Sequence, residues 1–337
     1  MPSVDQRPVL VVGGSGFVGR HLVEALQREG RTVRVFDRRP LNDLAVDQII
    51  GDLRDPLAVQ RACHGVQTVF QTASLVDWRP GNDALLHAVN VQGQRNVITA
   101  CQAQGQINLV YTSSIDVVFD GQPISDGDES LPYPRRHLDA YAHTKMLAER
   151  ETLAAHGQNG LRTCALRLAG VYGPRDPYRL PEIVQLARRN QFWRLGDGRA
   201  RFNHVYVENT AHAHLCAETA LNQGRAGGQS YFIADQPASN FFAFVASFAT
   251  DLGLPAPPRS IPFAVAYALA AALEGGAWLS RGRLGNPAFT RYVVASTCRD
   301  FCFRSERAAR ELGYVPPVSA QVARERTLAW LRQQSYG

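Results

Sequence analysis

Short apolar runs alternate with amphipathic stretches along the first half of the chain. The amphipathic stretches predict helices that end near Arg28, begin at Pro56, and span residues 83–104 and 139–157. The apolar runs predict strands, which are residues 8–13, 32–37, 48–52, 68–74, 107–114 and 161–170. Continuous Val, Ile and Leu strands separated by amphipathic helices are typical of a parallel sheet that is buried on both faces. The pattern therefore predicts an α/β fold with a Rossmann-type, doubly wound parallel sheet.

The pattern becomes irregular, and rich in Pro, Gly and Arg, after about residue 171. We therefore expect a Rossmann domain over residues 1–170 and a smaller, mainly substrate-binding C-terminal lobe over 171–337, with residues 204–235 returning to the sheet. The uncharged segment 260–273 is shorter than the roughly 18–20 apolar residues that a membrane span needs. It predicts a buried helix, a wall of a substrate site or an interfacial helix.

The charge balance is basic, with 36 Lys and Arg against 30 Asp and Glu, a net charge of +6 and a pI near 9.1. The basic side chains are scattered among acids, whereas nucleic-acid binding favours clusters of them on one face. We therefore expect no nucleic-acid partner. Lysine occurs only at Lys145, so nearly all of the basic residues are arginine. The arginine bias carries little functional meaning, but a single retained lysine indicates a function at its position.

The cysteines and histidines predict no metal site. Cys298 and Cys302 lack a second pair of thiols at zinc-binding spacing, while His212 and His214 face different sides of a predicted helix. The six cysteines are irregularly spaced, and the first residues, which include Asp5, do not resemble a secretory signal. These features predict free thiols in a cytoplasmic protein.

A glycine-rich loop joins the first predicted strand to the first predicted helix. The segment V-V-G-G-S-G-F-V-G contains Gly13, Gly16 and Gly19. Glycines there permit a tight turn and let the backbone approach a pyrophosphate, which is bound at the helix N-terminus. A glycine triplet alone can be an ordinary turn, but this one lies between a clear strand and a clear helix. The loop therefore predicts a dinucleotide site.

Asp37 ends the second predicted strand, 18 residues after Gly19. A carboxylate there can bind both ribose hydroxyls of NAD and would repel the 2′-phosphate of NADP. Arg38 beside it could accept that phosphate, so we expect NAD and leave NADP open. Asp52, after the third strand, is placed either to contact the adenine or to serve as a turn or helix-capping aspartate.

Tyr141 and Lys145 lie four residues apart on a predicted helix, so both side chains can act on one substrate. A phenol that titrates near 10 needs its pKa lowered by about 3 units to act as a base near neutral pH. A nearby ammonium and a positive nicotinamide ring both favour the phenolate. Such a pair alone is usually an exposed feature, but this one follows the dinucleotide loop and a strand that ends in Ser113 and Ser114. We therefore expect general acid–base chemistry here.

Together, these residues resemble the extended short-chain dehydrogenase/reductases. Four longer segments resemble the 3β-hydroxysteroid dehydrogenase branch. The segments are Y-T-S-S-I-D-V-V-F (111–119), A-Y-A-H-T-K-M-L-A-E (140–149), L-R-L-A-G-V-Y-G-P (166–174) and H-V-Y-V-E-N-T-A-H-A-H-L-C-A (204–217). The resemblance implies that Tyr141 exchanges a proton with the substrate, that Lys145 lowers its pKa and holds the nicotinamide ribose, and that Ser114 hydrogen-bonds the reacting oxygen. Ser113 is expected to pack or support the backbone.

The loop, the strand ends and the resemblance together give one set of expected cofactor-binding residues. The set is Gly13, Gly16, Phe17, Val18, Gly19, Asp37, Arg38, Asp52, Leu53, Ala73, Tyr141, Lys145, Ala169 and Val171. Asn90 resembles the family's helix-borne asparagine, or is a structural amide inside the helix. One departure is Gln71-Thr72-Ala73-Ser74, where relatives often carry His or Asn and Ala-Ala.

The resemblance implies an NAD(P)-dependent oxidoreductase that interconverts a secondary alcohol and a ketone on a bulky apolar substrate, foremost a 3β-hydroxysteroid or sterol. The alternatives are a reductase of long-chain 3-keto acids or related ketones, a nucleotide-sugar epimerase or dehydratase, and a non-catalytic cofactor-sensing protein. The last is disfavoured because Tyr141 and Lys145 are both present. We also expect a homodimer, and leave open a peripheral membrane contact through residues 261–273.

Overall fold

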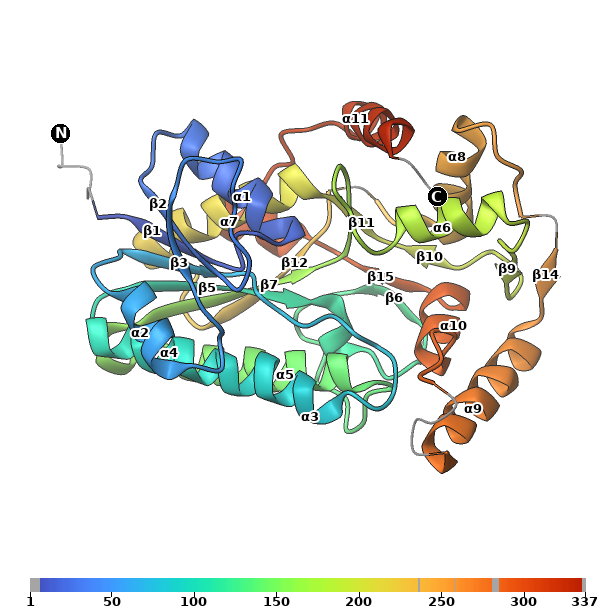
Figure 1. Ribbon diagram of the computed structural model, residues 1–337, viewed down its shortest axis with the longest axis horizontal. Coiled ribbons are helices and arrows are strands. Elements are labelled where there is room, and N and C mark those ends of the chain that lie inside the picture. The colour runs from blue at the N-terminus through green and yellow to red at the C-terminus, as the bar shows by residue number, and fades with distance from the viewer. Residues whose placement is uncertain (1–6, 236, 258, 281–284, 335–337) are drawn as a thin grey trace.

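A computed structural model describes residues 7–235, 237–257, 259–280 and 285–334. Seven parallel strands form a central sheet in the order β12-β7-β5-β4-β1-β2-β3 (Figure 1). Their bounds are β1 Val9–Val12, β2 Val33–Asp37, β3 Asp47–Ile50, β4 Thr68–Gln71, β5 Asn108–Ser114, β7 Arg162–Leu168 and β12 Gln229–Ile233. The predicted doubly wound parallel sheet is confirmed. The strand order reverses between β1 and β4, where sheets of this kind open a crevice for ligands.

Helices cover both faces of this sheet (Figure 1). The helices on one face are α2 (Pro56–Cys63), α4 (Gly93–Gln104) and α5 (Ala140–Ala154), and those on the other are α1 (Phe17–Arg28) and α7 (Val207–Asn222). Successive strand residues point to opposite faces. Accordingly Val9 and Val11 belong to one buried apolar cluster, whereas Leu10 and Val12 belong to another. The apolar strands that the sequence shows are therefore buried on both sides.

The helix that we expected over residues 83–104 contains a wider turn. α3 (Asp83–Leu86) continues into a π-helical segment, His87–Gln92, and then into α4. Asn90 lies in this segment, accepts a hydrogen bond from the Leu75 backbone N at 2.8 Å and donates one to the Leu75 O at 3.0 Å. The helix therefore widens where Asn90 holds the loop after β4, and π-turns are frequent at functional sites.

The last strand that we expected in the first half of the chain breaks at Ala169. β7 ends before this residue, and β8 (Gly170–Tyr172) pairs instead with β11 (His204–Tyr206). A Cβ atom on Gly170 would lie 2.1 Å from Nη1 of Arg179 and 2.5 Å from the Phe202 ring, so a side chain where the chain changes partner would require these two side chains to move. β8 and β11 therefore form a short parallel pair between the carboxyl end of β7 and the C-terminal lobe.

A second sheet, which the sequence pattern did not predict, joins three strands of the C-terminal half of the chain to β6 from the first half. Its order is β13-β10-β15-β6, with bounds β6 Ile124–Gly127, β10 Arg201–Phe202, β13 Ser239–Asn240 and β15 Phe301–Phe303. Strands of two to four residues are too short to show a periodicity. The remaining elements are 3₁₀ turns at Ile115–Val118 and Gln158–Gly160, α6 Leu180–Arg188, β9 Arg194–Leu195, α8 Phe241–Asp251, β14 Ser260–Ile261, α9 Phe263–Leu279, α10 Arg291–Cys298, a π-helical turn at Ala308–Leu312, and α11 Ala320–Gln333.

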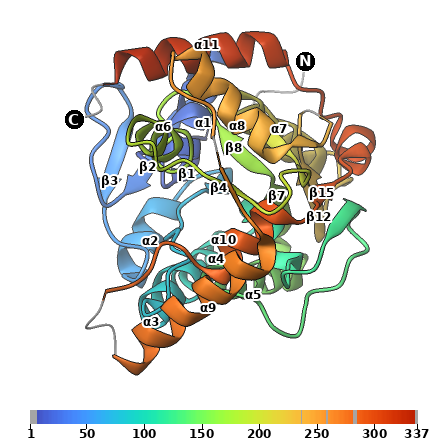
Figure 2. The ribbon, with the colours of Figure 1, turned by 90° about the vertical axis from the view of Figure 1, so that its right-hand side faces the viewer.

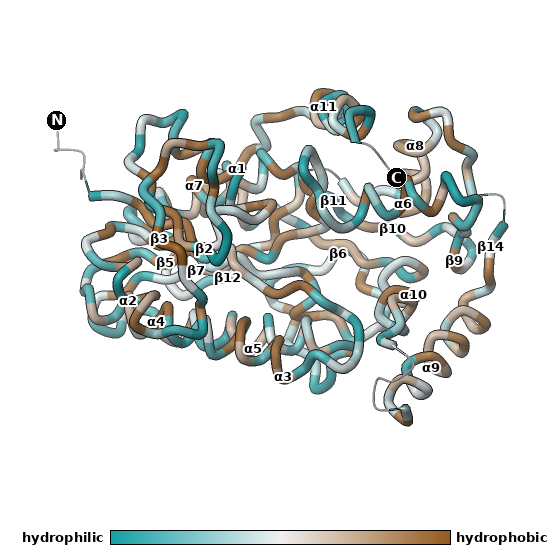
Figure 3. Tube along the Cα trace, viewed as in Figure 1, coloured by the Kyte–Doolittle hydropathy of each residue, from teal (hydrophilic) through white to brown (hydrophobic). Residues whose placement is uncertain are grey.

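The helices α8, α9 and α10 lie on the side of the molecule that faces the viewer in Figure 2. α9 is the most apolar of them, and Figure 3 shows hydrophobic residues along its length. In the part of the chain that the structure describes, no helix combines the length and the hydropathy that crossing a membrane requires.

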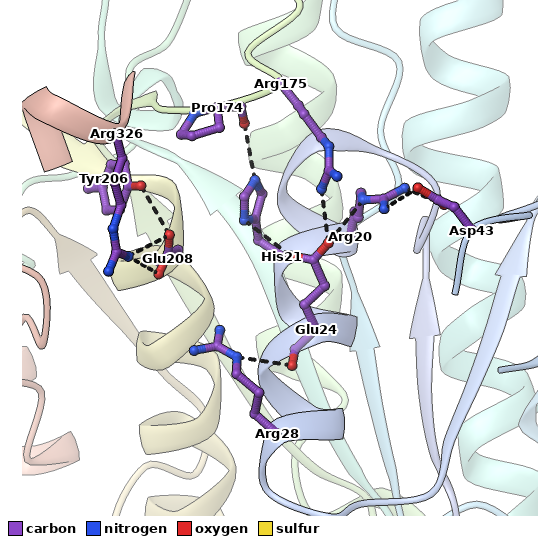
Figure 4. Close-up of polar contacts among 10 residues, drawn as sticks. All are labelled: Arg20, His21, Glu24, Arg28, Asp43, Pro174, Arg175, Tyr206, Glu208 and Arg326. Carbon is purple, nitrogen blue, oxygen red and sulfur yellow. Dashed lines mark hydrogen bonds and ion pairs between the residues drawn. The ribbon is translucent and has the colours of Figure 1, made fainter. Parts of the chain in front are cut away.

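Polar contacts hold the loop after β8 against α1 (Figure 4). His21 Nε2 lies 3.1 Å from the carbonyl oxygen of Pro174, and Arg175 Nη1 donates to Glu24 Oε1 at 2.9 Å. Burial lowers the pKa of His21, which favours its neutral ring. The loop joins Val171 to Asp176, and both of these residues line the cavity described below.

A buried ion pair fixes α5 on the sheet. Arg167 of β7 donates to Glu149 Oε1 from Nε at 3.0 Å and from Nη2 at 2.7 Å, and the Tyr133 hydroxyl donates to the same oxygen at 2.7 Å. The side chains of Arg167 and Glu149 are only 4% and 0% exposed. Two opposite charges are therefore held away from bulk solvent between the sheet and the helix that carries Tyr141 and Lys145.

Replacing Arg167 by Met should lower the free energy of unfolding by about 3–5 kcal/mol, because the Glu149 carboxylate would remain buried without its cation. The double variant Arg167→Met/Glu149→Leu should recover most of this loss, since an apolar pair needs no desolvation of charge. Urea denaturation followed by circular dichroism measures both. A double variant as unstable as the single one would contradict this account of the pair.

Candidate active site

A cavity of about 1140 Å³ runs from the carboxyl ends of the central strands into the C-terminal lobe. All of the predicted catalytic and cofactor residues line it, which are Gly13, Gly16, Phe17, Val18, Gly19, Asp37, Arg38, Asp52, Leu53, Ala73, Ser114, Tyr141, Lys145, Ala169 and Val171. Pockets for one small ligand usually measure about 300–1,000 Å³. The cavity therefore has room for a cofactor and a substrate placed end to end.

The glycine loop leaves a close-fitting cradle at the sheet end of the cavity. Gly13 has φ +85°, and a Cβ atom there would lie 2.6 Å from the backbone N of Ala73. A Cβ atom on Gly19 would lie 2.1 Å from the carbonyl oxygen of Gly13. Gly16 caps α1 without a side-chain hydrogen bond, so the N–H groups of the first helical turn are available to an anion. These features fit the pyrophosphate of a dinucleotide.

Asp37 lies beside this cradle at the end of β2. Its carboxylate accepts hydrogen bonds from the backbone N of Ser15 at 3.1 Å and of Arg39 at 3.0 Å. Each oxygen keeps a lone pair that can accept a ribose hydroxyl. The side chain of Arg38 is 68% exposed, and its Nη1 lies 3.9 Å from Asp52 Oδ2. The negative charge of Asp37 is thus at the position where NAD and NADP differ.

Asp52 also borders the cavity, but it does not cap the next helix. Asp55 is the N-cap of α2 and accepts hydrogen bonds from the backbone N of Leu57 and of Ala58. Asp52 binds the Arg54 guanidinium at 2.9 and 2.7 Å, and this bond lowers the pKa of the Asp52 carboxyl. Asp52 also accepts a hydrogen bond from the backbone N of Arg54 at 2.9 Å, so the turn role that we gave as an alternative is confirmed and only helix capping is wrong.

Lys145 is buried beneath the middle of the cavity, with 3% of its surface exposed. Its Nζ donates to the carbonyl oxygen of Thr112 at 2.5 Å and lies 4.2 Å from the centre of the Tyr111 ring. Burial lowers the pKa of Lys145 to about 7, and the charge of Glu149 one turn away opposes this shift. The ammonium is therefore held near its titration point by a fixed set of neighbours.

Ser114, at the end of β5, belongs to a hydrogen-bonded group that we did not anticipate. Its Oγ donates to Asp116 Oδ2 at 2.6 Å, and the hydroxyl of Tyr292 on α10 donates to Asp116 Oδ1 at 2.8 Å. All three side chains line the cavity. Burial raises the pKa of Asp116, whereas the hydrogen bonds from Ser114 and Tyr292 lower it.

Tyr141 lines the same part of the cavity, but its own surroundings do not favour the phenolate. Burial raises the pKa of Tyr141, the nearby carboxylates of Asp116 and Asp139 raise it further, and a hydrogen bond with Ser114 opposes them. We expected the Lys145 ammonium to lower this pKa. In the protein alone desolvation and the acidic neighbours dominate, and they raise it.

Two residues that we singled out prove to hold the backbone of the site. Asn90 is occupied by the Leu75 backbone and also donates to Thr144 Oγ1 on α5 at 3.1 Å. The Gln71 Oε1 accepts from the backbone N of Ala73 at 2.7 Å, so the unusual Gln fixes the residue that packs against the glycine loop. Both belong to the structural support of the cavity.

Asp116 and Tyr292 are the residues that the sequence reasoning missed. Asp116 could have been noticed, because an acid two residues after Ser114 follows a strand at the carboxyl edge of the sheet. Tyr292 carried no such signal, since it reaches the site only through the packing of α10.

The sequence profile of the 3-beta hydroxysteroid dehydrogenase/isomerase family matches residues 10–265. An Arabidopsis thaliana protein named 3beta-hydroxysteroid-dehydrogenase/decarboxylase isoform 2 is 37% identical over 96% of this chain. The chain spans 62% of the length of that relative. The Mus musculus protein named sterol-4-alpha-carboxylate 3-dehydrogenase, decarboxylating, is 36% identical over 94% of this chain and 89% of its own length.

A solved structure with the same arrangement is that of MoeE5 in complex with UDP-glucose and NAD. It aligns with a TM-score of 0.74 and 25% identity, and covers 97% of this chain and 99% of its own. The likeness extends over the sheet and the C-terminal lobe together.

Gly19→Ala should weaken dinucleotide binding and lower Tm, because the added Cβ meets backbone at 2.1 Å. NADH fluorescence titration and thermal unfolding measure the two effects. The control is Gly275→Ala in α9, where no heavy atom lies within 4 Å of the new Cβ. The control should gain up to about 1 kcal/mol of helix stability and leave NADH affinity unchanged. Equal NADH affinity in the two variants would contradict the cradle.

Proposed function

The chain belongs to the 3-beta hydroxysteroid dehydrogenase/isomerase family, and we propose that it is an NAD-dependent dehydrogenase that interconverts the 3β-hydroxyl group of a steroid or sterol and the corresponding 3-ketone. The observation that carries this proposal is that Ser114, Tyr141 and Lys145 line one cavity. The glycine loop lies at one end of this cavity, and the other end is an apolar chamber formed by the C-terminal lobe.

The cofactor end of the cavity supports NAD. The glycine loop fits a pyrophosphate, and the Asp37 carboxylate can accept ribose hydroxyls but repels a 2′-phosphate. MoeE5, which shares the fold, has been solved with NAD. When bound, NAD supplies the nicotinamide C4 that takes the carbinol hydride.

The chain's own residues orient the alcohol and move its proton. Ser114 and Tyr141 hold the reacting oxygen from two sides, and Tyr141 takes the hydroxyl proton during oxidation or returns it during ketone reduction. Lys145, held by the Thr112 carbonyl, lines the same cavity as Tyr141 and adds a positive charge there when it is protonated. This charge and that of the oxidised nicotinamide offset the burial that raises the pKa of Tyr141.

The chamber in the C-terminal lobe supports a bulky apolar substrate. Its lining is mainly aliphatic and aromatic, with a few polar side chains such as Arg179, Glu182 and Gln191. The apolar residues include Leu186, Phe192, Trp193, Phe242, Leu269 and Phe289. Burying such surface against a ring system gains about 25 cal/mol per Å², whereas a sugar hydroxyl left there without a partner costs free energy. A sterol nucleus therefore fits this lining better than a nucleotide sugar, although the MoeE5 likeness keeps sugar chemistry as the alternative. The names of the relatives point to 3β-hydroxysterols, with or without a 4-carboxylate, as the compounds to assay first.

α9 supports a peripheral contact with lipid at the mouth of this chamber. Leu269 and Leu273 line the cavity yet are 49% and 42% exposed, while Val265, Trp278 and Leu279 are 57%, 78% and 76% exposed. An apolar substrate could then pass from a membrane surface into the cavity without crossing water. A homodimer also stays a prediction, which light scattering after size exclusion measures.

Tyr141→Phe and Lys145→Met should each lower kcat/KM for NAD-dependent oxidation of a 3β-hydroxysteroid by about 10²–10⁴-fold, because each removes a group that handles the proton. NADH absorbance measures turnover, and NADH fluorescence should show that Tyr141→Phe still binds the cofactor. His143→Ala, exposed on the same helix, is the control and should stay within about twofold. Full activity of Tyr141→Phe, or turnover only of 3-keto acids or UDP-sugars, would contradict the proposal.

Val265→Glu/Trp278→Glu should abolish sedimentation of the protein with phosphatidylcholine vesicles, because both charges would enter the lipid interface. Val315→Glu places the same charge at a 68% exposed valine away from α9 and should sediment like the unmodified protein. If the unmodified protein does not bind vesicles, the membrane contact is wrong.

A further inference from the structure

The hydroxyl of Ser114 has a single proton, and the structure gives it a partner other than the substrate. Ser114 Oγ donates to Asp116 Oδ2 at 2.6 Å, a length typical of a hydroxyl bound to a carboxylate. The same Oγ accepts a bond from the backbone N of Asp116 at 3.3 Å. The proposed function needs this proton for the reacting oxygen. The proton cannot serve both acceptors at once.

The protonation state of Asp116 decides which acceptor receives it. An ionised carboxyl can only accept hydrogen bonds, so it captures the Ser114 proton and turns the serine's lone pairs toward the cavity. A ketone, which can only accept, then meets no donor on Ser114. A protonated Asp116 can instead donate to Ser114 Oγ, and the Ser114 hydroxyl becomes free to donate to the ketone.

We propose that Asp116 is a positioning residue that acts through Ser114, and that Ser114 donates a hydrogen bond to the substrate oxygen only while Asp116 carries a proton. The proposal rests on the proposed function in one respect, which is the role of Ser114 at the reacting oxygen. The proposal adds one requirement, which is that Asp116 must be protonated before Ser114 can donate to the substrate.

The surroundings of Asp116 suit this behaviour. The side chain is 8% exposed, and burial disfavours its charge, so the pKa of Asp116 is raised. The titratable and charged groups that act on it, or on which it acts, come from several elements and are Arg179 before α6, His137 before α5, Asp139 and Tyr141 at the start of α5, and Tyr292 on α10. Arg179 and His137 favour the carboxylate, whereas desolvation acts against it and is the largest effect.

Tyr292 fixes the orientation of the carboxyl group. It donates to Oδ1, so Oδ1 remains an acceptor and the added proton belongs on Oδ2, which faces Ser114. α10 comes from the C-terminal lobe, and its tyrosine is 176 residues from Asp116. The lobe that lines the substrate chamber therefore also holds the group that controls Ser114.

The test compares the pH dependence of kcat/KM for 3-ketosteroid reduction in three forms of the enzyme. The unmodified enzyme should lose activity as pH rises through the pKa of Asp116. In Asp116→Asn, Tyr292 holds the amide oxygen and the amide N–H donates to Ser114 permanently. This variant should keep kcat/KM within about fivefold of the low-pH value and lose that alkaline step, because one neutral hydrogen bond is replaced by another. Asp116→Ala takes no proton from Ser114 but does not orient its hydroxyl, so it should also lack the alkaline step and have a kcat/KM below that of Asp116→Asn.

Changes in kcat/KM with pH that are caused by titration of Lys145 or Tyr141 remain in Asp116→Asn. The difference between the pH profiles of the unmodified enzyme and this variant is therefore the contribution of Asp116. An alkaline step that persists unchanged in Asp116→Asn overturns the proposal. Activity of Asp116→Asn as low as that of Asp116→Ala overturns it as well.

Infrared spectroscopy of the cofactor-free protein tests Asp116 without any turnover. The unmodified protein minus Asp116→Asn should show a carboxylic-acid carbonyl band that disappears as pH rises. Tyr292→Phe removes a donor to the carboxylate and should move the midpoint up by about one unit. No such band at any pH where the protein is folded overturns the proposal. Absence of steroid turnover together with a titrating band would instead count against the proposed function alone.

Discussion

The site depends on one constraint, which is that all seven strands of the central sheet run in the same direction. Parallel strands bring their carboxyl ends to a single edge, so Asp37, Ala73 and Ser114 reach one cavity from three different strands. The reversal of strand order between β1 and β4 opens that edge beside the glycine loop. The C-terminal lobe then closes the far side and supplies the apolar chamber.

The single lysine shows how this edge creates chemistry. An exposed ammonium would keep its ordinary pKa, but Lys145 is buried against a strand carbonyl and an aromatic ring, and its pKa falls to about 7. The pKa of Tyr141 shifts the other way from that of Lys145, because burial and the carboxyl groups of Asp116 and Asp139 raise it. The protonation of the phenol thus depends on desolvation and a few opposed charges, and the positive nicotinamide ring of a bound NAD would favour the phenolate.

The local part of this arrangement could be predicted from the sequence, and the part made by distant packing could not. The glycine loop, Asp37 and the Tyr141–Lys145 pair each lie within a few residues of a strand or helix signal in the sequence, and all of them line the cavity. The second sheet was missed because its strands have two to four residues, and Tyr292 was missed because α10 packs there through tertiary contacts alone. The pKa of Tyr141 was expected to fall, since the spacing showed the ammonium but not the buried Asp116 and Asp139 carboxylates.

The central claim is that the cavity transfers hydride between C3 of a steroid and a nicotinamide ring. Incubation of the protein with NAD and a 3β-hydroxysteroid that carries deuterium at the 3α position tests it most directly. Mass spectrometry should find one deuterium in the NADH formed and a 3-ketosteroid without the label. If the protein binds NAD and the steroid yet no deuterium reaches the cofactor, the account is wrong.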